Sequence, residues 1–409
     1  MTIALQIAIL NDQTDAALIL LYNGVPLNQK YCTFYDGSKP LLNALQKQNK
    51  AVVDRILEAD VIVGDTPGTA SFLEAAAMWG DIPVIEDLIF MGADINAGRQ
   101  ATALAAAVTS KNRVLVELLL KHGASPNICA YSGLSPLEAA VNNKDDDMIQ
   151  LLISNDADPA CGNALHSAIE NYQQAFGILL ETFCARYPRG KKGFGGSLII
   201  NAIEKQEDEL LSAMLSAKFD INSFFEQRPT GLILLTALGF AITYKKGRDI
   251  NLVQRLIDNN AGGDLNSIAR KSSYGYLNKA RFEETALMVA IATRSKEMVE
   301  LLLKNGANIY QPARRGLKLT LLQQACNIGS FNMAKLLLEN GAIVNEEPAD
   351  RGGATALQLA ASSGSVKIAK LLLSHGALIH ASPAKMGGWT AFEGAARHGS
   401  LEMISVLWD

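Results

Sequence analysis

Short apolar helix patterns, paired across a polar break, recur along most of the chain. Residues 355–377 read TALQLAASSGSVKIAKLLLSHGA, in which a first apolar series around Leu357 and a second within 366–373 flank the polar Ser363 and Gly364. The pattern predicts two helices of roughly ten residues each, and isolated helices of that length are marginal in water. Such a unit must stack on copies of itself to bury its apolar faces.

Copies of this unit occur at regular intervals, in residues 102–126, 285–309 and 320–344. The apolar residue at the third position of each copy gives the register. The last four positions in this register are 35 residues apart, at Leu287, Leu322, Leu357 and Phe392. The equivalent earlier positions are Leu5, Leu41, Leu73, Leu104, Leu137, Leu165, Ile199 and Leu238. The register predicts an all-α solenoid of about twelve helix-turn-helix repeats, in which each repeat contacts its neighbours.

The repeat resembles the ankyrin repeat, whose pattern is TPLHxAA, two antiparallel helices and then GADxN. The best matches are SPLEAA at 135–140, ALHSA at 164–168 and GADIN at 92–96. The resemblance covers almost the whole chain, and it is specific because period, helix pair and turn all agree. It implies helix pairs joined by finger loops, with a surface of fingers and inner helices that binds another protein.

The chain differs from the ankyrin pattern at the histidine position and in the middle repeats, and its period and turns have a particular form. The histidine of the pattern is kept at His166, whereas other repeats have an acid or an amide there, at Glu74, Glu138, Gln358 and Glu393. The middle repeats match the pattern weakly. The 35-residue period with Gly-Gly turns at 352–353 and 387–388 is similar to that of fungal ankyrin-repeat proteins.

The weak matches divide the predicted solenoid into sections. We expect a single solenoid over residues 1–409, with regular repeats in 1–160, divergent repeats with basic insertions in 161–284, and regular repeats again in 285–409. The insertions are the glycine-rich ARYPRGKKGFGG at 185–196, residues 244–249, and the long finger 266–284. The glycine-rich insertion lacks the spacing of a phosphate-binding loop, which requires four residues between Gly and Gly-Lys-Ser/Thr.

Charge is separated along the chain, although the net charge is only −4. Residues 1–183 contain 10 Lys and Arg against 21 Asp and Glu, residues 184–319 contain 21 against 13, and residues 320–409 contain 6 against 7. The basic section coincides with the insertions, and opposite potentials on neighbouring sections would steer a partner of matching polarity. An acidic chain with one mildly basic section disfavours nucleic acid as that partner.

The sequence indicates a soluble protein of a reducing compartment. No stretch approaches the roughly 18–20 apolar residues that span a bilayer. The apolar Met1–Leu10 has no basic leader and fits the register as an inner helix. No CxxC pair occurs among the five cysteines, which argues against a zinc site or a disulfide framework; they are Cys32, Cys129, Cys161, Cys184 and Cys326. We expect a cytoplasmic protein, with the nucleus as the alternative.

Candidate binding residues follow from the geometry of stacked helix pairs, in which fingers and inner-helix ends line an extended surface. Tyr, Trp and Arg carry most interface energy, so we select them at these positions. The strongest cluster comes from successive fingers and would suit an acidic or phosphorylated segment. Its members are Tyr274, Tyr276, Arg281, Arg314 and Arg315. Further candidates for contact with a partner are Trp389, Trp79, Tyr131 and Arg99.

Motifs for catalysis, cofactors or metals are absent from the sequence. It contains no HExxH, no GxSxG and no close His–Cys or paired-carboxylate constellation. We therefore expect a non-enzymatic protein-interaction scaffold without cofactor or metal, which binds through the basic, aromatic middle section. Two alternatives stay open. One is an enzyme or small-molecule-binding protein with a pocket in the divergent repeats, and the other is the recognition module of a larger effector-type protein.

Overall fold

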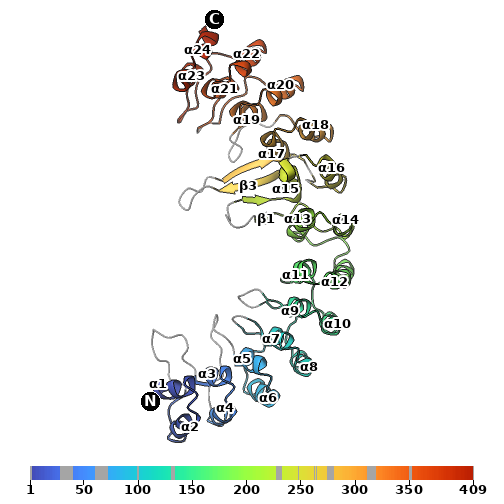
Figure 1. Ribbon diagram of the computed structural model, residues 1–409, viewed down its shortest axis with the longest axis vertical. Coiled ribbons are helices and arrows are strands. Elements are labelled where there is room, and N and C mark those ends of the chain that lie inside the picture. Colours follow the sequence, from blue (N-terminus) through green and yellow to red (C-terminus); the bar gives the residue numbers. More distant parts are fainter. Residues whose placement is uncertain are drawn as a thin grey trace. The chain divides into compact units, whose positions relative to one another are not determined.

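The structure is a computed structural model that describes residues 2–27, 40–59, 72–98, 101–129, 134–226, 233–246, 248–261, 263, 265–273, 281–310, 319–349 and 352–408. The chain forms two compact units, Met1–Pro188 and Arg189–Asp409, each built from helix pairs (Figure 1). The described residues contain twenty-four α-helices, two for each of the twelve repeats in the register. The mostly helical repeat architecture predicted from the sequence is confirmed.

The first unit contains six helix pairs. In each pair an inner helix precedes an outer helix, and successive inner helices pack side by side (Figure 1). The inner helices are α1 (Thr2–Leu10), α3 (Pro40–Gln46), α5 (Phe72–Trp79), α7 (Ala103–Thr109), α9 (Pro136–Asn142) and α11 (Ala164–Asn171). The outer helices are α2 (Thr14–Tyr22), α4 (Lys50–Leu57), α6 (Ile82–Phe90), α8 (Arg113–Lys121), α10 (Asp146–Ser154) and α12 (Gln173–Arg186).

The second unit also contains six helix pairs. Its inner helices are α13 (Gly196–Lys205), α15 (Ala237–Thr243), α17 (Ala286–Thr293), α19 (Leu321–Asn327), α21 (Ala356–Ser362) and α23 (Ala391–His398). The outer helices are α14 (Asp208–Ser216), α16 (Ile250–Asp258), α18 (Lys296–Lys304), α20 (Phe331–Glu339), α22 (Val366–Ser374) and α24 (Leu401–Trp408). A short 3-10 helix, η1 (Tyr244–Lys246), lies in the insertion predicted between α15 and α16.

Two neighbouring fingers of the second unit form a four-stranded antiparallel sheet that the sequence analysis did not predict. Its order is β1 (Phe225–Glu226), β2 (Ile233–Leu235), β3 (Ile268–Ser273) and β4 (Arg281–Thr285). The central strands come from different fingers, and their pairing places Leu234 opposite Lys271. The sheet therefore joins the finger before α15 to the finger before α17 (Figure 1). We call this element the finger sheet.

The predicted register marks the apolar core. All its side chains from Leu5 to Leu357 are at most 2% exposed. In the last repeat, Phe392 is half-buried and meets the Trp408 ring edge-on, with 6.1 Å between centroids. Alanine lets neighbouring inner helices approach closely, and in α7 every residue from Ala103 to Val108 is buried. These short helices are therefore stabilised mainly by packing between repeats.

The threonine that opens the repeat motif caps the inner helix. Thr102 Oγ1 accepts a hydrogen bond from the backbone N–H of Ala105 at 3.2 Å, which satisfies one of the free donors of the first helical turn. The same cap is present at Thr236, Thr285, Thr320, Thr355 and Thr390. The motif thus determines where these inner helices begin.

The side chain at the position of the ankyrin histidine connects a repeat to the finger that follows it. Gln323 accepts a hydrogen bond from the backbone N–H of Thr320 at 2.9 Å, and its Nε2 donates to the carbonyl of Glu346 at 3.1 Å. Gln358 makes the same pair of contacts one repeat later. Glu74 binds the next finger as an acceptor instead. At the position of the ankyrin histidine, the glutamine or glutamate side chain therefore makes a hydrogen bond that connects one repeat to the next.

Asparagines of the GADxN-type turns form a second series of bonds between repeats. Asn127 Oδ1 accepts from the backbone N–H of Asp158 at 2.7 Å, and Asn127 Nδ2 donates to the carbonyl of Asp156 at 2.9 Å. Asn96 and Asn345 each bind the turn that follows them in the same two ways. These bonds hold successive turns in register.

Replacing Gln323 with alanine is expected to lower the free energy of unfolding by about 1–2 kcal/mol, because a cap and a bond to the next finger are lost together. Gln324→Ala is the matched control. Gln324 is the next residue of α19, is half-buried and has no side-chain hydrogen bond within the described residues. Urea unfolding followed by circular dichroism measures both variants, and equal losses would contradict the connecting role of Gln323.

Candidate functional site

Most of the selected binding residues lie outside the described part of the chain. These are Tyr274, Tyr276, Arg314, Arg315, Tyr131 and Arg99. Arg281 begins β4, and only its backbone is described. The cluster expected on successive fingers therefore stays a prediction.

The two selected tryptophans are described, one in each unit. Trp79 ends α5 and is half-buried, next to the exposed Met78. Trp389 precedes α23, is 44% exposed, and has the guanidinium carbon of Arg397 4.4 Å from its ring centroid. This cation–π contact holds the indole in place. Trp389 is thus an ordered, partly exposed aromatic group on its finger.

Part of the positive charge in the basic section is neutralised within the fold. Arg270 of β3 pairs with Glu284 of β4. Arg255 of α16 pairs with Asp208 of α14, with 3.0 Å between nitrogen and oxygen. The count of basic residues in the sequence therefore overstates the positive surface of this section.

The finger before α13 keeps exposed positive charge, and we call its residues 189–194 the basic finger. Arg189 and Lys192 are exposed and form no ion pair with any residue that the structure describes. Lys191 Nζ lies over a phenylalanine ring of the same finger, 5.8 Å from its centroid. The exposed Lys218, from the turn that follows α14, borders this loop. Sequence reasoning noted the charge of this loop but tested it only as a phosphate-binding loop, whose spacing it lacks, and selected none of its residues.

The glycines of the basic finger allow close packing against the neighbouring turn. Asp220 Oδ2 accepts a hydrogen bond from the backbone N–H of Gly193 at 2.7 Å, and the Asp220 N–H donates to the carbonyl of Phe194 at 2.8 Å. Gly190 has a φ of +79°, and a Cβ there would lie 2.2 Å from the carbonyl oxygen of Lys218. The loop is therefore a fixed platform for its exposed cations.

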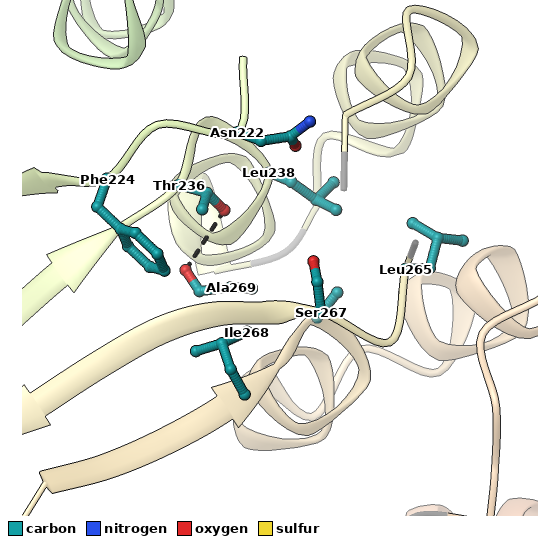
Figure 2. A pocket seen from close by; sticks show the side chains of 9 residues that line it. Asn222, Phe224, Thr236, Leu238, Leu265, Ser267, Ile268 and Ala269 are labelled. Atoms are coloured by element: carbon teal, nitrogen blue, oxygen red, sulfur yellow. Dashed lines mark hydrogen bonds between the residues drawn. The ribbon is translucent and has the colours of Figure 1, made fainter. Parts of the chain in front are cut away.

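A pocket of about 240 Å³ lies beside the finger sheet (Figure 2). Its lining is mostly apolar and consists of Asn222, Phe224, Thr236, Leu238, Leu265, Ser267, Ile268, Ala269 and Ala286. Thr236 Oγ1 donates to the carbonyl of Ala269 at 3.4 Å, so this hydroxyl already has a partner in the fold. Sequence reasoning assigned Leu238 to the core and selected no other lining residue, because a pocket between two fingers leaves no local signal.

The chemistry of this pocket favours an apolar side chain as its occupant. Its described lining has no carboxylate, histidine, cysteine or lysine that could act in acid–base or nucleophilic catalysis. Lys271 Nζ lies 4.7 Å from the ring centroid of Phe224 and 3.7 Å from the carboxylate of Glu283. The ammonium group of Lys271, paired with Glu283, thus lies beside an apolar cavity. Across the described residues, no three metal-ligating side chains lie close enough to hold an ion.

The sequence matches the family described as Ankyrin repeats (3 copies) over residues 72–163 and 310–383, and the family described as Ankyrin repeat over residues 282–314. A comparison with curated proteins finds no match. Among the described helices, none has the length and apolar character needed to cross a membrane. The chain belongs to the ankyrin repeat proteins, as the TPLH-like and GADxN-like residues predicted. The fungal similarity has no support in these matches.

Substituting Gly190 with alanine is expected to destabilise the second unit by about 1–3 kcal/mol more than Gly193→Ala, because only the first Cβ meets backbone. Both glycines have nearly the same φ, +79° and +78°, so both variants carry similar strain. A Cβ at Gly193 would have no atom within 4 Å. Urea unfolding of the two variants measures the difference, and a larger loss for Gly193→Ala would contradict the packing described here.

Proposed function

We propose that this ankyrin repeat protein is a non-enzymatic scaffold that binds another protein through its basic middle section, residues 184–319. The observation that carries the proposal is the fixed basic finger, which presents Arg189 and Lys192 without ion-pair partners among the described residues. A preorganised charged loop loses little conformational freedom on binding. It is therefore suited to recognition of a charged partner.

The partner chemistry that fits this surface is an acidic or phosphorylated segment. Guanidinium and ammonium groups bind carboxylates and phosphates through charge-assisted hydrogen bonds, which are about twice as strong as neutral ones. Lys191 and Lys218 extend the same positive surface around the loop. The rest of the chain is acidic, with 21 Asp and Glu against 10 Lys and Arg in residues 1–183. An acidic partner would therefore be steered to the basic section.

The pocket beside the finger sheet would take an apolar side chain of the same partner. Its lining offers Phe224, Leu238 and Ile268 as contacts. Lys271, beside Phe224, would bind a carboxylate or phosphate of the partner in exchange for its ion pair with Glu283. Buried apolar anchors surrounded by charge complementarity are a usual source of specific affinity.

The residues selected from the sequence stay part of the proposal. Tyr274, Tyr276 and Arg281 belong to the finger that contains β3 and β4, and Arg314 and Arg315 belong to the next finger. Trp389, Trp79, Tyr131 and Arg99 are proposed as further contacts. The cytoplasm, or alternatively the nucleus, is the proposed compartment.

Neutralising the basic finger with Arg189→Gln and Lys192→Gln is expected to weaken partner binding about tenfold or more, since two charge-assisted contacts are lost. The partner is first recovered from the native host with the intact chain and identified. Affinity is then measured for the intact chain and the variant at low and high salt. The control, Lys121→Gln with Lys367→Gln, makes the same charge change on exposed outer-helix positions outside the basic section.

Different results would contradict the specific site, the predicted cluster or the scaffold function. Equal weakening by the control and the basic-finger variant would contradict a specific site. A variant with Tyr274, Tyr276, Arg281, Arg314 and Arg315 all replaced by alanine tests the predicted cluster, and undiminished binding would remove it from the surface. Recovery of a metabolite without any protein partner would overturn the scaffold function in favour of a small-molecule-binding protein.

A further inference from the structure

Two thiols from successive repeats face each other in the first unit. Cys129 Sγ and Cys161 Sγ are 3.4 Å apart, although the two residues are 32 positions apart in the sequence. Each follows the turn at the end of an outer helix, α8 or α10, and their separation is close to one repeat period. Stacking of repeats therefore brings together two cysteines that no local motif connects.

The hydrogen bonds around the two thiols fix this arrangement. The Asn127 side chain binds the turn that precedes Cys161, and the Cys161 thiol donates to the backbone carbonyl of Asn127 at 2.9 Å. Gly162 leaves room for the pair, because a Cβ there would lie 3.4 Å from Cys129 Sγ and 2.9 Å from Ser135. Both cysteines are only partly buried. A small solute can therefore reach a thiol pair that is already aligned.

We propose that Cys129 and Cys161 are an oxidation site, at which a peroxide converts the thiol pair into a disulfide that links successive repeats. The sulfur atoms would have to approach by only about 1.4 Å to reach the S–S bond length of about 2.05 Å. The link would join the beginnings of two neighbouring fingers, one of which contains Tyr131. This inference does not depend on the proposed partner.

The reaction is balanced with hydrogen peroxide as the two-electron oxidant. The thiolate of one cysteine attacks a peroxide oxygen, the O–O bond breaks, and a sulfenic acid forms while the departing hydroxide takes up a proton. The thiolate of the other cysteine attacks the sulfenic sulfur, and the S–O bond breaks as the S–S bond forms. Two thiols and one peroxide thus give one disulfide and two water molecules.

Protonation of the Cys129 thiol should limit the rate of this reaction. Burial, together with the hydrogen bond to Cys161, raises the pKa of Cys129 to about 12, and the charges of Cys161 and Glu138 act in the same direction. The thiolate is the reactive form of cysteine. We therefore expect slow oxidation at neutral pH and faster oxidation as the pH rises.

The test treats the reduced full-length chain with hydrogen peroxide at mildly alkaline pH, after removal of the reductant. Peptide mapping without reduction should find Cys129 linked to Cys161. The melting temperature of the first unit should rise by about 5–10 °C, because the link constrains the unfolded chain. Cys129→Ser and Cys161→Ser should each abolish the link and the shift. Cys184→Ser, which changes an exposed cysteine, should retain both.

Two results would overturn the proposal. One is oxidation of Cys129 or Cys161 to sulfinic acid without a link between them. The other is a disulfide that pairs either residue with Cys32, Cys184 or Cys326. Reduction of the oxidised wild-type chain should return the melting temperature to its starting value, and this measurement is independent of how well the serine variants fold.

Discussion

Contact between successive repeats is the interaction on which this structure depends. No described helix is longer than the 14 residues of α12, and helices of this length are marginal when isolated. Apolar side chains of the paired helices, the register positions among them, form the buried core, and the hydrogen bonds of Gln323, Gln358 and the turn asparagines satisfy polar groups between repeats. A substitution that removes one of these contacts is therefore expected to destabilise both of the repeats that it joins.

The divergent middle replaces some of these regular connections with others. The finger sheet joins two fingers by strand pairing, and Asp220 fixes the basic finger against the next turn. The family matches, at 72–163 and 282–383, fall on either side of this section. Irregular fingers on a repetitive frame can present charge and a pocket without disturbing the core. For this reason we propose the binding surface in this section.

The fold could be predicted from the sequence to a large extent, because its information is local and repeated. The period located the inner helix of every repeat, from Leu5 to Phe392, and Thr at the start of the motif explains the caps. The finger sheet could not be predicted, since Leu234 and Lys271 pair across more than one repeat. The ion pair between Arg270 and Glu284 could not be predicted either, because a count of charged residues does not tell which of them are paired.

The spacing of two cysteines in the sequence could have predicted that they are neighbours, but it was not used. Residues one period apart at the same position of a repeat become neighbours, so the separation of Cys129 and Cys161 indicates their proximity. Searching the cysteines only for CxxC pairs missed this proximity. The same reasoning applies to any reactive pair in a repeat protein, and it requires only the register.

Hydrogen–deuterium exchange of the full chain, with and without its recovered partner, tests the central claim most directly. The claim is that the basic middle section binds the partner. The account predicts slower exchange in the basic finger and in the strands and pocket-lining segments of the finger sheet, within residues 184–319. Protection confined to residues 1–183 or 320–409 would contradict it.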